Sequence, residues 1–313
     1  MNIPINASTR SASLLSARVK HPTSESSQLA TATPPPIANK LMQVFTATPI
    51  YPVISHEFCL GRTEETVIAA ALAAGAKVIQ LRDKTHSTST SASFTTKVRS
   101  IKKLTEQYKA LLIINDNIDI ALAEANGVHL GQNDLPLHLA FAKRHQAKRD
   151  HDFIIGLSTH NAAEIKVAST FARSELLFYM NIGPIYPTQT KAHPTTPALG
   201  IANFKNLNRL FKQLLNDASH SNCRETGYYK TAMLSAVEEN RIPAERVNVR
   251  LSKSLVPVTV MGGIKERHLK ELVLAGAKHF AMVTEITTAP NVEQKVRALI
   301  TAVNTIKQSH DIL

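Results

Sequence analysis

The sequence predicts an α/β fold in which eight parallel strands close into a (β/α)8 TIM barrel. Two observations lead to this fold class. From Tyr51 onward, short apolar runs alternate with Ala-rich stretches of helical character, and there are eight segments of each kind. Strands that are apolar on both faces are typical of a parallel sheet covered by helices, and eight strand–helix units favour a closed barrel. A doubly wound open sheet is the alternative, although that fold would usually need fewer strands.

The expected strands are runs of four or five mostly apolar residues. In chain order they are Tyr51–Ser55, Val78–Leu81, Leu111–Asn115, Gly127–Leu130, Phe153–Leu157, Leu177–Asn181, Val258–Met261 and His279–Val283. Helices are expected between and after them at Glu64–Ala74, Ala92–Tyr108, Ile118–Ala125, Leu135–Lys143, Asn161–Thr170, Phe204–Leu215, Glu266–Ala275 and Val292–Lys307. Each strand is thus followed by a helix that can cover the outside of the sheet.

The amino-terminal segment lies outside this pattern. Residues 1–45 are rich in Ser, Thr, Ala and Pro, contain Pro34-Pro35-Pro36 and show no sustained period. This composition predicts a low-complexity, disordered extension. It is also acid-poor, as transit peptides are, whereas it lacks the apolar core of a secretory signal. We therefore divide the chain into this extension and one barrel domain, residues 46–313.

A second unusual segment separates the sixth helix from the seventh strand, at about 216–255. A connection of this length is rare within a compact domain. Because it precedes a strand, we expect a surface insertion on the barrel face opposite to the usual active site. A contact with an oligomer partner is the alternative role.

Polar residues gather directly after the expected strands, and in a closed parallel barrel these carboxyl ends meet at one mouth, where barrel enzymes have their active sites. Gln80, Arg82 and Lys84 alternate after the second strand, so an extended segment points them to one side. One amide and two cations on one side suit an oligophosphate. An ordinary solvated strand end is the plainer alternative.

Two carboxylates, Asp116 and Asp134, follow the neighbouring third and fourth strands. Their side chains can therefore approach each other within a few ångströms. Two oxygen donors without nearby Cys or paired His favour a hard cation such as Mg²⁺, which keeps water ligands and bridges to phosphate. Either residue could instead cap the helix that follows it.

A second anion site is expected on the other side of the mouth. Thr188, Thr190 and Lys191 lie in a Pro- and Thr-rich loop after the sixth strand, where hydroxyls and an ammonium can hold a monophosphate; a purely structural turn is the alternative. Gly262-Gly263 after the seventh strand allow a ligand to approach the backbone closely, and loops after strands seven and eight commonly bind phosphate in such barrels. Two anion sites predict transfer between two phosphorylated substrates.

Other chemistry finds less support in the sequence. His129 lies in an apolar run and is expected to be a core or lining residue, and His160 and His193 do not have zinc spacing. Cys59 and Cys223 have no recognisable base nearby and are too few for a disulfide scaffold, which fits a cytoplasmic location. The sequence contains neither a P-loop nor a GxGxxG motif.

The net charge of +12 over 313 residues favours anionic partners, and most of the excess lies in the predicted barrel. Nucleic-acid binding is not expected, because the usual basic stripe with interleaved aromatic residues is lacking. A membrane protein is excluded, because no apolar run approaches the roughly 20 residues of a membrane span. Phosphorylated small molecules are therefore the expected partners, and a homo-oligomer remains open.

At these residues the chain resembles the thiamine phosphate synthase family. Six matching stretches follow one another in the family's order and span nearly all of residues 50–310. They are QLRDK at Gln80–Lys84, IINDN at Ile113–Asn117, GVHLGQNDLP at Gly127–Pro136, GLSTH at Gly156–His160, GPIYPTQTK at Gly183–Lys191 and GGI at Gly262–Ile264.

The resemblance implies a transferase of thiamine biosynthesis. It would couple hydroxymethylpyrimidine diphosphate to a thiazole phosphate, or its carboxylated form, giving thiamine phosphate and pyrophosphate. The implied pyrimidine diphosphate site consists of Gln80, Arg82, Lys84, Asn115, Ser158 and Lys191, of which Arg82, Lys84, Ser158 and Lys191 would be catalytic. The implied Mg²⁺ ligands are Asp116 and Asp134. The implied thiazole phosphate site consists of Thr188, Gln189, Thr190, Gly262, Gly263, Val283 and Thr284.

The chain departs from the family pattern at two strand ends. The first strand usually ends in Thr-Asp, where this chain has Ser55-His56, and the last motif usually reads Ser-Ala-Ile, where this chain has Thr284-Glu285-Ile286. Glu285 adds a negative charge that would weaken phosphate binding if it points inward. A thiazole tautomerase-like paralogue and a non-catalytic barrel that serves as a binding scaffold are the alternatives.

Overall fold

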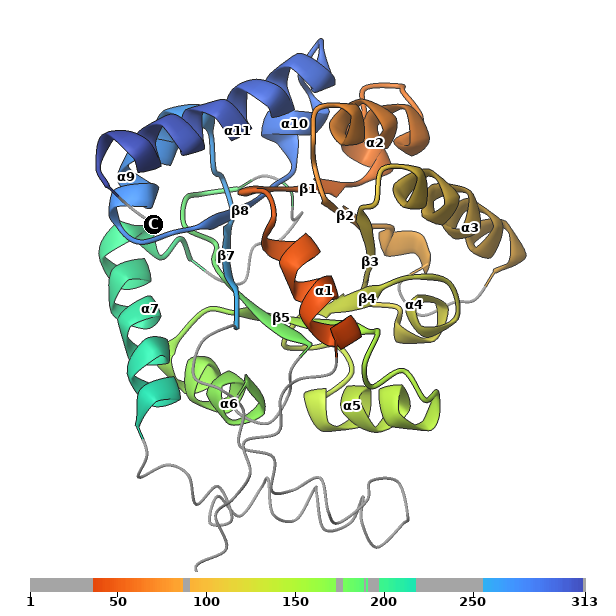
Figure 1. The fold of residues 1–313 in the computed structure, drawn as a ribbon, viewed down its shortest axis with the longest axis horizontal. Helices are drawn as coiled ribbons and strands as arrows, with labels where there is room; N and C mark the ends of the chain where they lie inside the picture. The colour runs from red at the N-terminus through yellow and green to blue at the C-terminus, as the bar shows by residue number, and fades with distance from the viewer. Residues whose placement is uncertain are drawn as a thin grey trace, which may run out of the picture. The chain divides into compact units, whose positions relative to one another are not determined.

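The structure, a computed structural model, describes residues 36–86, 91–172, 177–188, 190, 197–217 and 256–311. All of these belong to one compact unit that extends from Thr31 to Leu313. Eight parallel strands follow one another in chain order around a closed barrel, and the last strand pairs with the first. The prediction of a (β/α)8 barrel is therefore confirmed (Figure 1).

The eight expected strands and the eight expected helices lie within a few residues of their predicted positions. The strands are β1 Ile50–Ile54, β2 Val78–Leu81, β3 Leu111–Asn115, β4 Gly127–Leu130, β5 Ile154–Thr159, β6 Phe178–Ile182, β7 Val258–Met261 and β8 His279–Met282. The α-helices are α1 Pro36–Thr46, α2 Glu64–Ala73, α3 Ala92–Gln107, α4 Ile118–Glu124, α5 Leu137–Gln146, α6 Ala162–Ala172, α7 Gly200–Asn216, α9 Leu269–Leu274, α10 Thr284–Thr287 and α11 Val292–Ser309. Short 3₁₀ helices occur at η1 His56–Phe58, η2 Lys84–His86 and η5 Glu266–His268.

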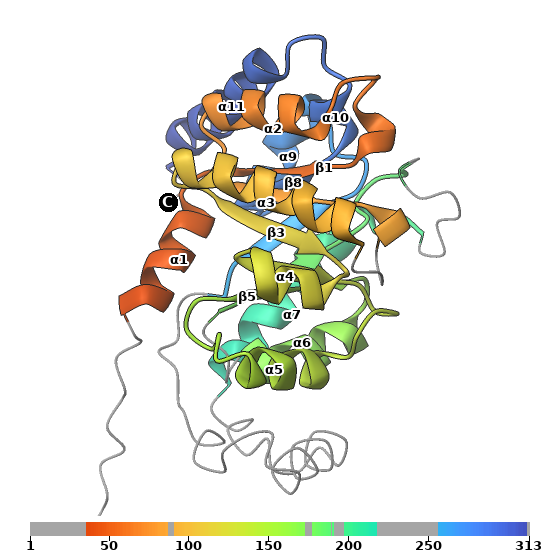
Figure 2. The same ribbon diagram turned by 90° about the vertical axis from the view of Figure 1, so that its right-hand side faces the viewer.

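The strand β3 shows why the strands are apolar on both faces. Leu112 and Ile114 pack in the layer between the barrel and the helices. Leu111 and Ile113 point the other way, into a separate cluster inside the barrel. Successive side chains of a strand alternate between its faces, so a strand buried on both sides must be apolar at nearly every position. In Figure 2 the helices α3 and α4 are seen lying along the side of the barrel.

The helix α1 contradicts part of the expected disordered extension. It occupies residues 36–46, so the assignment of residues 1–45 to a disordered segment is wrong at its carboxyl end. Leu41, Met42, Val44 and Phe45 of this helix pack with residues inside the barrel. Their spacing is that of one helix face, but the pattern covers little more than one turn and is hidden by the Pro-rich composition before it. Residues 1–35 lie outside the described part of the chain.

The helix α1 closes the floor of the barrel, by which we mean the amino-terminal ends of the strands. The ring of Phe45 lies 4.5 Å from that of Tyr179 and 5.7 Å from that of Tyr51, measured between centroids. Tyr51 and Tyr179 are each near the start of their strands, β1 and β6. Figures 1 and 2 show α1 across this end of the barrel.

Replacing Phe45 by alanine is expected to lower the free energy of unfolding by about 3–5 kcal/mol, because it removes a buried aromatic ring from the barrel floor. Urea denaturation followed by circular dichroism measures this loss. Lys40→Ala on the same helix is the matched control, since Lys40 is exposed and such surface changes stay within about 0.5 kcal/mol. Equal effects of the two substitutions would contradict the packing role of α1.

The insertion expected at about 216–255 lies outside the described residues, apart from its first two residues. Among the described helices, none is long and apolar enough to cross a membrane.

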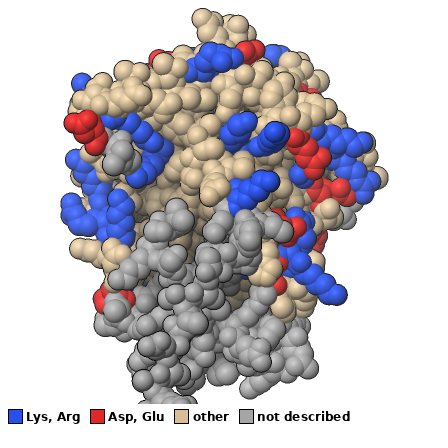
Figure 3. Space-filling model, viewed as in Figure 1, with Lys and Arg blue, Asp and Glu red and all other residues tan. Residues whose placement is uncertain are grey.

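Basic side chains outnumber acidic ones on the described surface of the face that carries α1 (Figure 3), so the excess positive charge is not confined to the opposite end of the barrel.

Candidate active site

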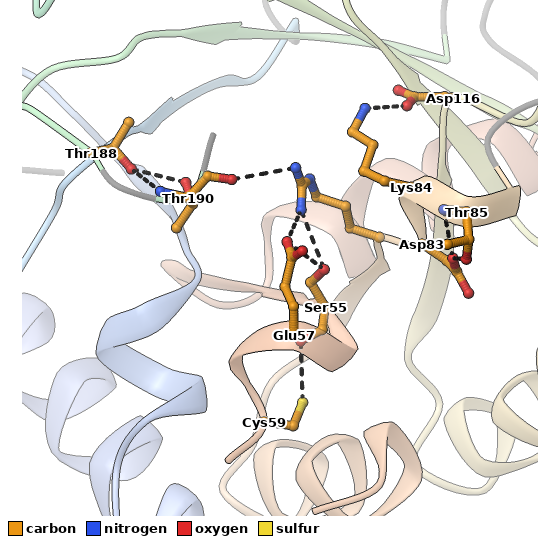
Figure 4. Close-up of polar contacts among 10 residues, drawn as sticks. Ser55, Glu57, Cys59, Asp83, Lys84, Thr85, Asp116, Thr188 and Thr190 are labelled. Atoms are coloured by element: carbon orange, nitrogen blue, oxygen red, sulfur yellow. Dashed lines mark hydrogen bonds and ion pairs between the residues drawn. The ribbon is translucent and has the colours of Figure 1, made fainter. Parts of the chain in front are cut away.

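The mouth of the barrel, formed by the carboxyl ends of the strands, brings together most of the predicted site residues that the structure describes. Arg82 follows β2, and its guanidinium connects two sides of this mouth. Its Nη1 donates to Ser55 Oγ at 3.2 Å and to Glu57 Oε1 at 2.7 Å, and its Nη2 donates to the Thr190 carbonyl at 3.4 Å. The predicted diphosphate and monophosphate sites are therefore neighbours (Figure 4).

The Arg82 guanidinium is held by acceptors of the protein itself. Its side chain is 14% exposed, whereas that of Glu57 is 53% exposed, so the ion pair lies at the edge of the mouth. Glu57 is not among the site residues predicted from the sequence. Its only sequence signal is an acidic residue two positions after the end of the first expected strand.

Lys84 lies on η2, and its side chain points toward Asp116, which follows β3 (Figure 4). Its Nζ lies 2.5 Å from Asp116 Oδ2, and its side chain is half exposed while that of Asp116 is buried. The alternating cations therefore do not form one cluster in this structure. Instead, Lys84 balances the negative charge of the buried Asp116 carboxylate, and Arg82 forms an ion pair with Glu57.

Asp116 and Asp134 come together as predicted. Burial, together with a hydrogen bond to Asp134 and its negative charge, raises the pKa of Asp116 to about 6, although Lys84 opposes this shift. The alternative reading of both residues as helix caps is wrong. The side chain of Asn117 caps α4, and Asp134 Oδ2 instead accepts from the Gly131 backbone N–H at 2.6 Å.

This carboxylate pair fits Mg²⁺ better than a fully protein-bound metal. Burial is the largest cause of the raised pKa of Asp116, and the neighbouring Asp134 adds to it, so a shared cation would suit this pair of carboxyl groups. Among the described residues, no group of three or more His, Cys, Asp and Glu side chains could hold a metal ion. Mg²⁺ is commonly held by one or two carboxylates, with waters and substrate phosphates supplying the remaining ligands.

A chain of hydrogen bonds fills the barrel between floor and mouth. It runs from Gln80 Nε2 to the Tyr51 hydroxyl (2.9 Å), on to the Tyr179 hydroxyl (2.9 Å), to His129 Nδ1 (2.7 Å), and from His129 Nε2 to Ser158 Oγ (2.9 Å). Burial raises the pKa of both tyrosines, so their hydroxyls stay neutral. The predicted residues Gln80 and Ser158 are the two ends of this chain, and the expectation that His129 lines the core is confirmed.

The tyrosines in this chain were missed because their role depends on the barrel's closure. Tyr51 and Tyr179 are 128 positions apart. A Cβ at Gly156 on β5 would lie 2.2 Å from the Tyr179 ring, so this glycine makes the space that the ring occupies. An aromatic residue at an inward position of a strand is the one sequence signal for them, and inward positions recur at every second residue along β1 and β6.

Asn115, at the end of β3, has an unused hydrogen-bond donor. Its side chain is buried, and its Nδ2 has no acceptor among the described residues. A buried donor without a partner is costly, so this amide is positioned for an acceptor that a ligand would supply. The observation agrees with the predicted place of Asn115 in a binding site.

Thr188 and Thr190 contact each other in the loop after β6. Their hydroxyls lie 2.8 Å apart, and the Thr190 N–H also donates to Thr188 Oγ1 (Figure 4). Gln189 and Lys191 lie outside the described residues. Gly262 and Gly263 have positive φ angles of 94° and 62°.

The two glycines make room for this loop. A Cβ at Gly262 would lie 2.4 Å from Pro184 Cβ, and one at Gly263 would lie 2.3 Å from the Pro187 carbonyl oxygen. The Tyr186 N–H donates to the Gly262 carbonyl. Close approach at these positions is thus to the neighbouring loop, and their expected contact with a ligand remains a prediction.

The remaining predicted residues follow β8. Val283 precedes the short helix α10, and Thr284 is its first residue. Thr284 Oγ1 accepts a hydrogen bond from Lys265 Nζ at 3.3 Å. Cys59 is buried, and burial raises its pKa to about 11, which agrees with the expectation that it is no nucleophile.

Comparisons with known proteins agree with this arrangement. Residues 50–214 match the family model described as thiamine monophosphate synthase. The thiamine-phosphate synthase of Dictyoglomus turgidum is 31% identical over 252 residues, which cover 80% of this chain and 88% of that protein. The thiamine-phosphate synthase of Shouchella clausii is 31% identical over 260 residues, which cover 83% of this chain and 98% of that protein.

Solved structures support the fold. The thiamine phosphate pyrophosphorylase from Pyrococcus furiosus superimposes with a TM-score of 0.58 at 20% sequence identity, covering 83% of this chain and 98% of that one.

Proposed function

The chain belongs to the thiamine monophosphate synthase family, and on this premise we propose that it is a thiamine phosphate synthase. As such a transferase, it joins hydroxymethylpyrimidine diphosphate to a thiazole phosphate and releases pyrophosphate. The observation that carries the proposal is the position of Arg82. Its guanidinium lies between Glu57, which follows β1, and the threonine loop after β6, where two anionic substrates would meet.

The proposed reaction needs no protein nucleophile. The bond between the pyrimidine methylene carbon and the diphosphate oxygen breaks, and the electron pair leaves with pyrophosphate. The resulting cation is delocalised over the aminopyrimidine ring, and the thiazole nitrogen forms the new bond to the same carbon. The protein must therefore stabilise negative charge on the leaving group, align the two substrates and keep water away from the cation.

The residues of this chain suit these three tasks. Arg82, Lys84 and Lys191 are proposed to hold the oxygens of the departing pyrophosphate. Asn115 offers its unused Nδ2 donor to the pyrimidine substrate. The hydroxyl of Ser158 is fixed by His129, so it meets the same substrate in one orientation.

The carboxylates of Asp116 and Asp134 are proposed to hold Mg²⁺. When bound, Mg²⁺ would supply positive charge that balances the diphosphate. Thr188, Thr190, Val283 and Thr284, with the backbone of the two glycines after β7, are proposed to hold the thiazole phosphate. Gln189 keeps its predicted place in the same loop.

A coupling assay tests the proposal. With both substrates and Mg²⁺, the full chain is expected to form thiamine phosphate and pyrophosphate in equal amounts, and excess chelator should stop the reaction. Full turnover in chelator would contradict the Mg²⁺ assignment. A thiazole tautomerase would isomerise a carboxythiazole phosphate without consuming the diphosphate, and a binding scaffold would convert neither substrate; either result would overturn the proposed function.

A further inference from the structure

Lys265 lies at the mouth and is not among the site residues predicted from the sequence. It follows β7, and its Nζ donates to Thr284 Oγ1 at 3.3 Å and pairs with Glu285 Oε2, also at 3.3 Å. One third of its side chain is exposed. A cation thus lies directly between the strand ends of β7 and β8, where barrels of this type commonly bind phosphate.

The backbone around Lys265 is fixed to the neighbouring loop. The Lys265 N–H donates to His268 Nδ1 at 3.1 Å, and the His268 ring stacks on that of Tyr186 with centroids 3.9 Å apart. Tyr186 belongs to the loop after β6, and its hydroxyl donates to Glu271. Lys265 is therefore anchored to the same loop that carries Thr188 and Thr190.

Glu285, which is the counter-ion of Lys265, also contacts other groups. Glu285 Oε1 lies 3.5 Å from Lys295 Nζ and accepts from the Glu266 backbone N–H at 3.3 Å. If the ammonium of Lys265 moves to another anion, the Glu285 carboxylate keeps a cation and a backbone donor. The pair between Lys265 and Glu285 can therefore open without leaving an uncompensated carboxylate.

We propose that Lys265 is a further substrate-binding residue, whose ammonium binds the phosphate of the thiazole substrate beside the Thr284 hydroxyl. This inference rests on the proposed function. A phosphate monoester carries nearly two negative charges at neutral pH, so it attracts the ammonium more strongly than the single charge of Glu285. The acidic departure from the family pattern at position 285 is thereby offset, because its carboxylate is directed at two lysines and not at the ligand.

Calorimetric titration of thiazole phosphate into the full chain tests this role. Lys265→Met keeps most of the length of the side chain and removes its charge, and it is expected to weaken binding roughly tenfold or more. Lys295→Met is the matched control, because it removes the other lysine beside Glu285. The affinity of this variant for thiazole phosphate is expected to stay within about twofold of the wild-type affinity. Thermal unfolding of each variant checks that the barrel remains folded.

Glu285→Gln separates substrate binding from a purely structural ion pair. If Lys265 binds the phosphate, removing its competitor should leave the affinity unchanged or increase it. If the ion pair serves only to hold the two segments together, both Lys265→Met and Glu285→Gln should weaken binding equally, and the inference would be overturned. Equal affinity of the wild type and Lys265→Met would also overturn it, as would a wild type that does not bind thiazole phosphate.

The coupling assay keeps the two hypotheses distinguishable. A wild type that binds thiazole phosphate through Lys265 but forms no thiamine phosphate would refute the proposed function and leave the binding role standing. Conversely, the wild type could catalyse coupling normally while Lys265→Met leaves the Kd for thiazole phosphate unchanged. That result would refute the binding role of Lys265 alone.

Discussion

Arg82→Ala is expected to lower kcat/KM for coupling by about a thousandfold, at the upper end of what removing one preorganised donor costs. The guanidinium is the group that spans the two sides of the mouth, from Glu57 to the Thr190 carbonyl. Without it, charge on the departing pyrophosphate loses a fixed cation. Steady-state kinetics with each substrate varied in turn measures this loss.

The variant should fold normally. The Arg82 backbone N–H donates to the Ile54 carbonyl whatever the side chain is, and Glu57 is exposed enough to be solvated when its partner is gone. Glu57→Gln provides the companion variant. It removes the protein's own competitor for Arg82, so the KM for the pyrimidine diphosphate should fall or stay the same. An unchanged kcat/KM in Arg82→Ala would refute the role of this residue in diphosphate binding.

Asp116→Asn is expected to lower the Mg²⁺-dependent rate by about 10²–10³-fold, because it removes one of two carboxylates that would hold the cation. It should also abolish stabilisation by Mg²⁺, measured as the rise in Tm on adding the ion. Asp119→Asn is a matched control on α4, since Asp119 is exposed and pairs only with Lys143 among the contacts that the structure records for it. A variant at Asp116 that keeps the wild-type response to Mg²⁺ would contradict the assignment.

The pH dependence of stability gives an independent readout of the same site. Burial and the neighbouring Asp134 raise the pKa of Asp116 from 3.8 to about 6. The folded protein therefore binds this proton more tightly than the unfolded chain does. In the metal-free protein the contribution of Asp116 to stability is complete below about pH 4 and is lost as the pH rises through 6.

Mg²⁺ should reverse this trend, because it binds the ionised carboxylates. Its stabilising effect is therefore expected to grow as the pH rises through 6. Thermal unfolding between pH 4 and 8, with and without Mg²⁺, measures both slopes. Asp116→Asn should flatten both, and a wild-type metal-free profile that is as flat as that of Asp116→Asn would show that Asp116 titrates as an ordinary exposed carboxylate.

The fold could be predicted from the sequence because its signal is local and repeated. Segments such as β3 are apolar at every position before the last, and polar residues begin abruptly at Asn115 and Asp116. The helix α1 could not be found in this way, since its single apolar face is too short to stand out from a Pro-rich context. Its position became evident only with the inward-facing aromatic residues that it covers.

The candidate site was predictable where its chemistry lies next to a strand end and unpredictable where it depends on three-dimensional proximity. Asp116 and Asp134 follow neighbouring strands, so their approach follows from topology. The contact of Arg82 with Glu57 depends on a short 3₁₀ turn, and that of Lys265 with Glu285 depends on the stagger between β7 and β8. Neither contact has a spacing rule that the sequence could reveal.

The strands of this barrel are only four to six residues long, which makes the barrel shallow. One layer of side chains separates the Phe45 ring at the floor from Gln80 and Ser158, because Tyr51 and Tyr179 touch the first and connect by hydrogen bonds to the others. A change at Phe45 on α1 is therefore expected to reach Gln80 and Ser158 through two tyrosine rings, although Phe45 precedes the first strand and lies at the other end of the barrel.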